Sequence, residues 1–454
     1  MSKIDPTIFR KYDIRGVVPG QLDSQKAKLI AESFAAYLQE NNHRQKVVVG
    51  CDGRVSSPDL KAVVIEGLLN RGVDVLDIGL VSTPLAYFAN FNSEYESAIM
   101  ITGSHNPKDF NGMKFVLDRK PFFDQQLTGL CDAINKGLIL QNERKGSLEI
   151  RNISKEYVDF VVRKALLATL PSDLRIGWDP GNGAVGAVLP ELLGYLPNQN
   201  FLINGEVDGN FPNHHPDPSV SKNLNQLRDL ITKEGLDYGI AFDGDGDRVG
   251  VLDSKGDVVS NEILMQLFTD YHSKTHDQPA VIFDIKTSAE VLHAADKLGA
   301  KPILWKTGHS YIKEKMAELN AKFAAEMSGH MFFAENFGYD DGIFAAAKFL
   351  ELVSSGYQLD NYKINEVSTD EMRIDCADDK KFGVIDKIRA KLDSDGKKYN
   401  GIDGVRIDEE GGWWLLRASN TQPALVLRVA ANNQEELDEL YDSVKDLLKL
   451  FINI

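Results

Sequence analysis

Cysteine is scarce in this sequence, which has only Cys51, Cys131 and Cys376 among 454 residues. Their spacing matches no metal-binding pattern, which excludes a cysteine-ligated metal site, and so few cysteines predict a reducing compartment. Apolar runs are short as well, and none approaches the roughly 20 residues that span a bilayer. The first residues lack the apolar segment of a secretory signal. The sequence therefore predicts a cytoplasmic protein with no membrane partner.

Positive charge is in deficit, because 51 Lys and Arg face 67 Asp and Glu and leave a formal net charge of −16. This excess of negative charge argues against nucleic acid as a partner. An anionic substrate would bind only where Lys, Arg and backbone N–H groups gather. The P-loop pattern GxxxxGK[ST] is also absent, which argues against a P-loop nucleotide kinase.

What the chain does contain is a repeated unit: an apolar run that ends in Asp, a glycine-rich or polar turn, and a helix-like segment. Four segments follow it, 47–54, 175–181, 238–244 and 280–286. Apolar strands that alternate with helices predict α/β layers with mostly parallel sheets. Apolar residues at helical spacing predict helices over 27–38, behind a cap at Asp23 or Ser24, and over 60–69.

The end of the chain follows a different pattern. Alternating segments predict strands over 366–376, 404–408, 413–417 and 424–430, and a helix over 434–451. Strands grouped together with a helix at the end predict a smaller α+β domain. We expect domain boundaries near residues 150, 254 and 365, which divide the chain into 1–150, 151–254, 255–365 and 366–454.

One serine lies between the apolar run 98–101 and a helix-breaking Asn-Pro pair. We expect Ser104 to lie on a tight turn at the carboxyl end of a buried strand, where its hydroxyl is displayed to a ligand. The basic residues His105, Lys108 and Lys114 are near it in sequence and favour a phosphorylated serine. Taken alone, an ordinary Gly-Ser-Asn-Pro turn is the simpler interpretation.

Three aspartates, Asp243, Asp245 and Asp247, follow an apolar strand and alternate with glycines. Such carboxylates can converge on one hard cation, and Mg²⁺ commonly completes its shell with a phosphate oxygen. An EF-hand begins in the same way but needs Gly and Glu where this chain has Arg248 and Ser254. Two alternatives stay open: a solvated acidic turn, and an aspartyl-phosphate enzyme with Asp243 or Asp245 as the nucleophile.

A glycine pattern over 181–186, GNGAVG, formally matches the dinucleotide-binding fingerprint. Glu206 lies about where a ribose-binding acid is expected. Short glycine patterns are common by chance, however, and Pro180 lies inside the turn. We expect these glycines to form a strand-to-helix turn. A dinucleotide-dependent oxidoreductase is the alternative, and an NAD titration would test it.

Five motifs, in this order along the whole chain, resemble the α-D-phosphohexomutase family, most closely its bacterial phosphomannomutase/phosphoglucomutase branch. They are YDIRG at 12–16, TGSHNP at 102–107, DGDGDR at 243–248, EMSGH at 326–330 and RASNT at 417–421. The resemblance implies three tandem related α/β domains and a C-terminal α+β domain similar to the TATA-binding protein, around a central cleft. It also implies interconversion of hexose 6-phosphates and 1-phosphates through a phosphoserine and a bound hexose 1,6-bisphosphate.

The resemblance also implies roles for individual residues. The catalytic set is Ser104 as the phosphoserine, with Lys114 as the expected general base and His105, Arg15 and Arg248 nearby. The metal set, which would hold Mg²⁺, is Ser104, Asp243, Asp245 and Asp247. Sugar hydroxyls O3 and O4 would be held by Glu326 and Ser328, close to His330. The non-reacting phosphate would be held by Arg417, Ser419, Asn420 and Thr421, with Lys286, Tyr12 and His309 from other domains.

Mannose and glucose share their configuration at C3 and C4, so contacts to O3 and O4 predict activity on both sugars. Ala325 stands where the motif is expected to have glycine, and Met327 differs from the glutamine expected in the phosphoglucosamine branch. The alternatives are a phosphoglucosamine mutase, an aspartyl-phosphate phosphotransferase, and a non-enzymatic metal-binding or scaffold protein. We expect a monomer, with a dimer as the alternative. The preferred sugar and the pathway served do not follow from the sequence.

Overall fold

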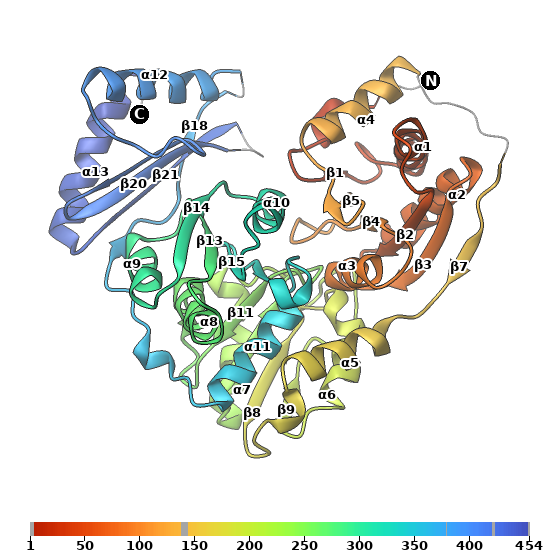
Figure 1. Cartoon of the computed structure of the whole chain (residues 1–454), viewed down its shortest axis with the longest axis horizontal. Helices are drawn as coiled ribbons and strands as arrows, with labels where there is room; N and C mark the ends of the chain where they lie inside the picture. Colours follow the sequence, from red (N-terminus) through yellow and green to blue (C-terminus); the bar gives the residue numbers. More distant parts are fainter. Residues whose placement is uncertain (1–3, 138–143, 378, 420–422, 453–454) are drawn as a thin grey trace. The chain divides into compact units, whose positions relative to one another are not determined.

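The computed structural model describes residues 4–137, 144–377, 379–419 and 423–452. Contacts between residues divide the chain into two compact units, and most of their helices and strands are labelled in Figure 1. Unit 1 comprises Met1–Ser260 and Ser328–Tyr357, and unit 2 comprises Asn261–Met327 and Gln358–Ile454. Residues 328–357, which the sequence groups with 255–327, therefore pack with the first half of the chain.

The first sheet of unit 1 carries the Ser104 turn at the end of an inner strand. Its strands are β1 Ile14–Val17, β2 Lys46–Cys51, β3 Asp74–Leu80, β4 Ser97–Ile101, β5 Phe110–Leu117, β6 Lys120–Pro121 and β7 Leu148–Ile150. They are ordered β1-β5-β4-β2-β3-β7, with β6 paired to β5. Strands β2, β3, β4 and β7 are parallel, whereas β5 is antiparallel to both β1 and β4. The strand predicted over 98–101 is confirmed as β4, and all of its residues are buried.

Both helices predicted in this region are confirmed. The helices are α1 Ser24–Glu40, α2 Ser57–Asn70, α3 Thr83–Phe91 and α4 Gln125–Lys136, preceded by a 3₁₀ turn, η1 Pro6–Ile8. The Asp23 carboxylate caps α1 by accepting a hydrogen bond from the Lys26 N–H at 2.8 Å. Gly67 of α2 faces α1 so closely that a Cβ there would lie 2.9 Å from the Lys28 carbonyl oxygen. Glycine at this position thus allows the two helices to pack against each other.

The second sheet of unit 1 carries the three aspartates. Its strands are β8 Arg175–Asp179, β9 Gln199–Leu202, β10 Tyr238–Phe242, β11 Val249–Leu252 and β12 Val258–Val259, in the order β12-β11-β10-β8-β9. The accompanying helices are η2 Leu167–Thr169, α5 Ser154–Lys164, η3 Ala184–Ala187, α6 Leu189–Leu193, η4 Ser221–Leu224 and α7 Asn225–Glu234. The glycines of 181–186 make the turn from β8 into η3, where a Cβ on Gly183 would lie 2.9 Å from the Gly244 carbonyl oxygen. The turn interpretation of these glycines is confirmed.

An aromatic cluster explains why residues 328–357 pack within unit 1. This segment contains β16 Met331–Phe333, η5 Ala334–Asn336 and α11 Gly342–Ser354. The Phe337 ring stacks on Phe91 of α3 at 5.0 Å and on Phe160 of α5 at 5.7 Å between centroids. The Tyr157 hydroxyl of α5 lies 3.0 Å from the Asp341 carboxylate, which caps α11. The segment thus packs against helix α3 of the first region and helix α5 of the second.

Unit 2 begins with a parallel sheet. Its strands are β13 Ala280–Asp284, β14 Lys301–Trp305 and β15 Phe323–Ala325, in the order β14-β13-β15. Its helices are α8 Asn261–Thr275, α9 Ala289–Lys297 and α10 His309–Leu319, followed after residue 357 by η6 Leu359–Asn361. Strand β15 ends at Ala325, directly before the EMSGH motif at 326–330.

The last sheet is antiparallel and belongs to the smaller α+β region that the sequence predicts. Its strands are β17 Val367–Ser368, β18 Met372–Asp375, β19 Val405–Glu409, β20 Gly412–Ala418 and β21 Ala424–Ala431, and α13 Gln434–Lys449 closes the chain. The order is β17-β21-β20-β19, with β18 also paired to β21. The prediction of one strand over 366–376 is wrong, because this segment pairs with β21 in two separate stretches. A helix that was not predicted, α12 Lys381–Ser394, packs on this sheet through Ile388 and Leu392.

The fold class predicted from the sequence is confirmed: three α/β regions, each with its own sheet, precede a smaller α+β region. Among the described residues, every helix is too short or too polar to cross a membrane.

Candidate active site

The Ser104 turn follows β4 and is tightly hydrogen bonded. Ser104 has a left-handed backbone, with φ of 50°, and its N–H donates to the Thr102 hydroxyl at 2.8 Å. The prediction that its hydroxyl is displayed is wrong, because Ser104 is only 2% exposed. The loop after β10 covers it: a Cβ on Gly244 would lie 2.4 Å from the Ser104 carbonyl oxygen. Glycine at 244 thus allows the acidic loop to lie directly on the serine.

The three aspartates of that loop converge, as predicted. Asp243, Asp245 and Asp247 are fully buried, and one carboxylate oxygen from each lies within 4.8 Å of the others. The Asp243 Oδ1 accepts from the N–H groups of Gly246 and Arg248, at 3.0 and 3.2 Å, and so folds the loop back on itself. Its Oδ2 lies 3.4 Å from the Ser104 Oγ. Residues 139 positions apart in sequence therefore meet at one point.

These buried carboxylates fit a hard cation. Burial, together with the charges of Asp247 and Asp245, raises the pKa of Asp243 well above its usual range. Among the described residues, the Asp245 Oδ1 is buried and accepts no hydrogen bond. The Asp247 Oδ1 is in the same position. Such oxygens are costly to bury without a partner, and converging carboxylates of this kind suit Mg²⁺. The donor set therefore matches the predicted metal.

Lys114 provides the closest positive charge. Its Nζ donates to the Asp245 Oδ2 at 2.7 Å and also to the Asp247 Oδ2. Burial alone would lower the pKa of Lys114, but these two carboxylates outweigh burial and raise that pKa well above its usual range. In this arrangement Lys114 is an ammonium ion.

His105 differs from Lys114 in charge. Its Nδ1 lies 3.1 Å from the Ser104 Oγ. Burial, followed by the charges of Arg248 and Arg15, holds the pKa of His105 well below its usual range. A neutral imidazole therefore lies against the serine hydroxyl at neutral pH.

Two arginines, Arg15 and Arg248, lie beside Ser104 and the three aspartates. Arg15 pairs with Asp13 at 2.7 Å, and its Nη1 donates to the Asn106 Oδ1 at 3.0 Å, which brings it to the Ser104 loop. Arg248 Nε donates to the His330 Nε2 at 3.0 Å. The ring proton of His330 is therefore assigned to Nδ1. The predicted residues Tyr12 and Ser328 are half-buried members of unit 1.

The remaining predicted residues belong to unit 2, where separate loops carry them. Glu326 is buried, and its Oε1 accepts from the Gly308 N–H at 2.5 Å, next to His309 at the start of α10. Lys286 Nζ lies 3.2 Å from a carboxylate oxygen of Glu371. Its backbone oxygen accepts from the Arg428 Nη1 at 3.0 Å.

The phosphate-binding segment predicted at 417–421 lies at the end of β20. Arg417 Nη2 pairs with the Asp403 carboxylate at 3.0 Å. The Ser419 N–H donates to the Ala424 carbonyl oxygen at 2.9 Å, which continues the pairing of β20 with β21. The predicted residues Asn420 and Thr421 lie outside the described residues.

Comparison with known protein families gives one answer over the whole chain. The phosphoglucomutase/phosphomannomutase alpha/beta/alpha domains I, II and III match residues 6–138, 155–256 and 260–370, and the C-terminal domain of that family matches 371–447. The chain belongs to the phosphoglucomutase/phosphomannomutase family.

Relatives within this family are similar over their full length. The chain is 40% identical over 439 residues to the phosphomannomutase/phosphoglucomutase of Pseudomonas syringae pv. tomato, covering 96% of this chain and 93% of that protein. It is 36% identical over 456 residues to a phosphoglucomutase of Neisseria gonorrhoeae, covering 99% and 98%. A solved structure of a phosphoglucomutase/phosphomannomutase family protein from Burkholderia thailandensis has a TM-score of 0.92 at 34% identity and 98% coverage of both chains. This chain is a hexose phosphate mutase, an intramolecular phosphotransferase.

Two buried aspartates of this mutase were not predicted as site residues. Asp340 Oδ2 lies 3.1 Å from the His330 Nδ1 and so orients that ring. Asp284 accepts from the Thr307 hydroxyl and the Met327 N–H, both at 3.2 Å, and so joins the ends of all three strands β13, β14 and β15. A signal existed for Asp284, which ends the fourth copy of the strand–Asp–turn repeat. The sequence contains no comparable signal for Asp340.

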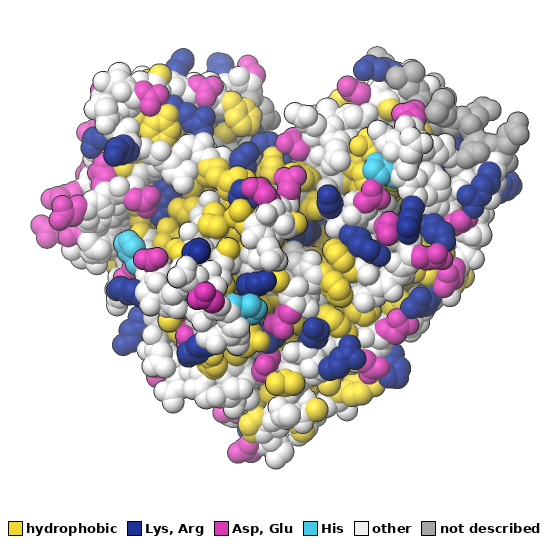
Figure 2. All heavy atoms as spheres, viewed as in Figure 1, with side chains coloured by type: hydrophobic (Ala, Val, Ile, Leu, Met, Phe, Trp, Pro, Cys, Tyr) yellow, Lys and Arg dark blue, Asp and Glu magenta, His cyan; other side chains and the backbone are white. Residues whose placement is uncertain are grey.

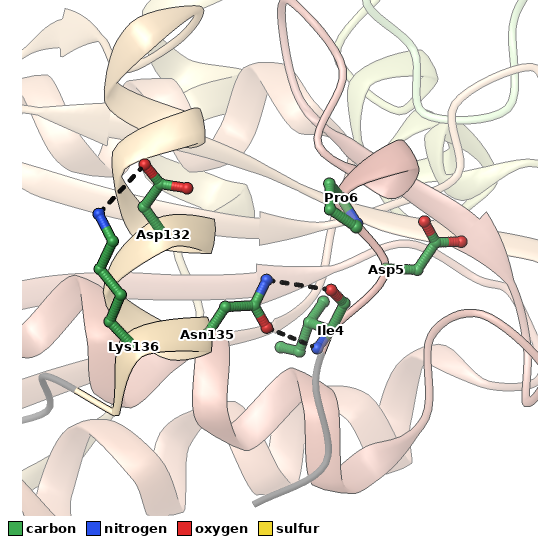
Figure 3. Close-up of a pocket in the computed structure, with 6 residues that line it drawn as sticks. All are labelled: Ile4, Asp5, Pro6, Asp132, Asn135 and Lys136. Carbon is green, nitrogen blue, oxygen red and sulfur yellow. Dashed lines mark hydrogen bonds and ion pairs between the residues drawn. The ribbon is translucent and has the colours of Figure 1, made fainter.

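The pocket in Figure 3 lies outside the mutase site. It has a volume of about 530 Å³ and is lined by Ile4, Asp5, Pro6, Asp132, Asn135 and Lys136. The Asn135 side chain accepts from the Ile4 N–H at 2.9 Å and donates to the Ile4 carbonyl oxygen at 3.2 Å, and so fastens the start of the chain to α4. No predicted site residue lines it. On the face shown in Figure 2, acidic and basic side chains are interspersed.

Proposed function

We propose that Ser104 is the phosphoryl carrier of this mutase, which interconverts the 6-phosphates and 1-phosphates of mannose and glucose. The observation that carries this proposal is the approach of the Ser104 Oγ to 3.4 Å from the Asp243 carboxylate, inside a buried cluster of three aspartates. The names of the relatives, phosphomannomutase/phosphoglucomutase and phosphoglucomutase, support both sugars.

The aspartates supply the proposed metal site. Asp243, Asp245 and Asp247, with a phosphate oxygen on Ser104, would hold Mg²⁺. A bound Mg²⁺ would offset the negative charge that develops on the transferring phosphoryl group. Arg15 and Arg248 would add positive charge from the protein itself, because Arg15 contacts the Ser104 loop at Asn106 and the Arg248 Nε lies 3.9 Å from an Asp243 carboxylate oxygen.

Two residues are proposed to move protons. His105 is neutral and lies 3.1 Å from the Ser104 Oγ, which suits it to take the serine proton and to return it. Lys114 is the proposed base for the sugar hydroxyl. The carboxylates of Asp245 and Asp247 stabilise the charged form of Lys114 when no cation is bound. The pKa of Lys114 would fall once these carboxylates bind a cation, because their charge would then be neutralised.

The substrate would be held by the remaining residues. Glu326 and Ser328, with His330 nearby, would bind the sugar hydroxyls O3 and O4. The non-reacting phosphate would be bound by Arg417, Ser419, Asn420, Thr421, Lys286, His309 and Tyr12. The phosphoserine would donate to the free hydroxyl, and the resulting hexose 1,6-bisphosphate would turn end for end and return its other phosphate to Ser104. This cycle needs no nucleotide, since one phosphate ester replaces another.

We also propose domain boundaries near residues 150, 254 and 365, and a cytoplasmic monomer that binds phosphosugars and neither nucleic acid nor membranes.

The test compares Ser104→Ala with Ser172→Ala, a change at an exposed serine. We expect Ser104→Ala to abolish turnover of mannose 1-phosphate and glucose 1-phosphate, and Ser172→Ala to leave it unchanged. Mass spectrometry of the purified wild type should locate one phosphoryl group on Ser104. A phosphoryl group on Asp243 or Asp245 would replace this proposal with an aspartyl-phosphate mechanism. Faster turnover of glucosamine 1-phosphate than of either hexose phosphate would identify a phosphoglucosamine mutase.

A further inference from the structure

A buried arginine lies directly behind the Ser104 loop. Arg54 follows β2 and is only 1% exposed. Its guanidinium donates to four backbone carbonyl oxygens of the loop, those of Ser104 at 2.7 Å, Asn106 at 2.6 Å, Pro107 at 2.6 Å and Phe110 at 2.9 Å. One side chain therefore fixes both ends of the loop and its middle.

Asp52 completes this contact. Its carboxylate lies 3.3 Å from the Arg54 Nε and balances the buried charge. The same carboxylate accepts from the Gly103 N–H at 3.1 Å, immediately before the serine. It is itself held by the Ser57 hydroxyl at 2.5 Å. The Asp52–Arg54 pair thus binds an N–H and four carbonyl oxygens of one short segment.

Neighbouring residues pack tightly around the Arg54 guanidinium and the Ser104 loop. A Cβ on Gly103 would lie 2.5 Å from the Arg54 Nε, so only glycine fits between the loop and the arginine. The Phe211 ring covers the guanidinium at 5.3 Å. The His215 Nε2 lies 2.5 Å from the His105 carbonyl oxygen, the one carbonyl of 104–107 that Arg54 does not reach.

We propose that Arg54 is a positioning residue for phosphoryl transfer, which acts through the backbone of the Ser104 loop. By drawing four carbonyl oxygens to one side, it turns the negative ends of their dipoles away from the phosphate that Ser104 would carry. It also fixes the Ser104 Oγ relative to Asp243. The proposal rests on the proposed role of Ser104, and it adds that the position of the hydroxyl depends on a group that touches neither substrate nor metal.

A lysine cannot replace this arginine. The planar guanidinium presents five donors in a fixed fork, whereas an ammonium presents three donors from one point. Arg54→Lys keeps the charge but loses simultaneous contact with the two ends of the loop. A displacement of about 1 Å at a reacting atom costs roughly 100-fold in rate. The expected effect is therefore on kcat, because the groups proposed to bind the sugar phosphate lie on other loops.

The experiment measures kcat and KM for glucose 1-phosphate in Arg54→Lys, Arg54→Ala, Ser104→Ala and Arg228→Lys, and follows folding by circular dichroism and thermal melting. Arg228 is the matched control, because it donates to the carbonyl oxygens of Gly256 and Ser221, outside the proposed site. We expect kcat of Arg54→Lys to fall by about 100-fold with KM unchanged. Guanidinium ion, but not urea, should partly restore kcat of Arg54→Ala. Arg228→Lys should match the wild type.

The kinetics and folding of these variants test the role of Arg54. Wild-type kcat in a folded Arg54→Lys would overturn the proposal. A loss of kcat that follows the loss of folded protein, without rescue by guanidinium, would reduce Arg54 to a stabilising residue. If Arg54→Ala does not fold, the kcat and KM of Arg54→Lys decide alone. An active Ser104→Ala would refute the role of Ser104 instead, whatever Arg54 does.

Discussion

The Ser104 loop of unit 1 and the Lys286 turn of unit 2 are each held by the same kind of contact. In both, a buried arginine donates hydrogen bonds to backbone carbonyl oxygens. Arg54 binds four of them around Ser104. Arg406, also fully buried, binds those of Ile285 and Thr287, at 2.7 and 2.5 Å, on either side of Lys286.

The two arginines differ in where they come from. Arg54 follows a strand of the same sheet as Ser104, so the reacting loop is fixed by its own region. Arg406 comes from β19, in the last sheet, and reaches across to the turn after β13, with its guanidinium 4.2 Å from the Trp413 ring. The position of Lys286 thus depends on contact between two regions of unit 2. This difference suits a proposed site in which one end reacts and the other must accept a substrate in two orientations.

The largest effect is expected from the acidic loop of unit 1. Asp245→Asn removes the negative charge of one proposed metal ligand, and with it the 2.7 Å ion pair with Lys114. We expect kcat at saturating Mg²⁺ to fall by roughly 10³-fold, since electrostatic stabilisation of the transferring group is lost. Asp253→Asn is the control, because Asp253 caps the β11–β12 turn by accepting from the N–H groups of Lys255 and Asp257. If Asp245→Asn keeps the kcat of the wild type, the Asp245 carboxylate has no role in the reaction.

The second prediction tests whether Arg406 and Arg54 affect different kinetic constants. Arg406→Met removes charged hydrogen bonds to Ile285 and Thr287, so we expect the free energy of unfolding to fall by about 3 kcal/mol. KM for glucose 1-phosphate should rise because Lys286 loses its support, while kcat changes little. Urea unfolding and steady-state kinetics measure these, with the exposed Arg373→Met as control. If Arg406→Met lowers kcat as Arg54→Lys does, the distinction between the two regions fails.

A smaller effect is expected at the proposed phosphate site. Arg417→Lys keeps the charge but loses paired hydrogen bonds to a phosphate, worth about 1.5 kcal/mol, or roughly tenfold in affinity. KM should rise about tenfold and kcat should stay near that of the wild type, as measured by initial rates. Arg373→Lys is the control. A fall in kcat without a change in KM would place Arg417 in the transfer step instead.

The smallest effect is a dependence of stability on pH at His214, the neighbour of the His215 ring that contacts the Ser104 loop. Burial lowers the pKa of His214, but its hydrogen bond with Asp179, at 2.9 Å, outweighs this and raises that pKa above the ordinary value of 6.5. Its contribution to stability is therefore fully present below pH 6.5 and is lost as pH rises through the raised pKa.

His214→Asn should flatten that part of the stability curve, whereas the exposed His276→Asn should not. Urea unfolding at a series of pH values measures both variants. The Arg54 contact should be insensitive to pH over the same range, since arginine stays charged. A curve for His214→Asn with the slope of the wild type would show that this pair does not titrate with folding.

Local signals were enough to predict much of the fold. Each strand–Asp–turn repeat is confirmed as β2, β8, β10 or β13, and the aspartates that follow or end them are all buried. What each aspartate does could not be predicted, because its partners come from distant loops. Asp179 contacts His214, Asp284 contacts Met327, and Asp243 turns an oxygen towards Ser104.

The failed predictions have the same origin. The tight turn around Ser104 predicts an exposed serine, but the loop after β10, which carries Gly244, covers it. The regular alternation of 366–376 predicts a continuous strand, but its pairing with β21 is interrupted. The helix α12 was missed, although Val384, Ile388 and Leu392 follow helical spacing, because many charged residues surround them.

The enclosure of Ser104 has a consequence for cellular signalling. A protein kinase or a phosphatase must draw a serine into its own active site, and that requires a segment that can be pulled out from the surface. Here the segment is tied to Arg54 by four carbonyl oxygens and is covered by the loop after β10. Its phosphorylation would then be exchanged only with small phosphosugars, so the modification state of this chain would record the supply of sugar bisphosphate and not the activity of signalling enzymes.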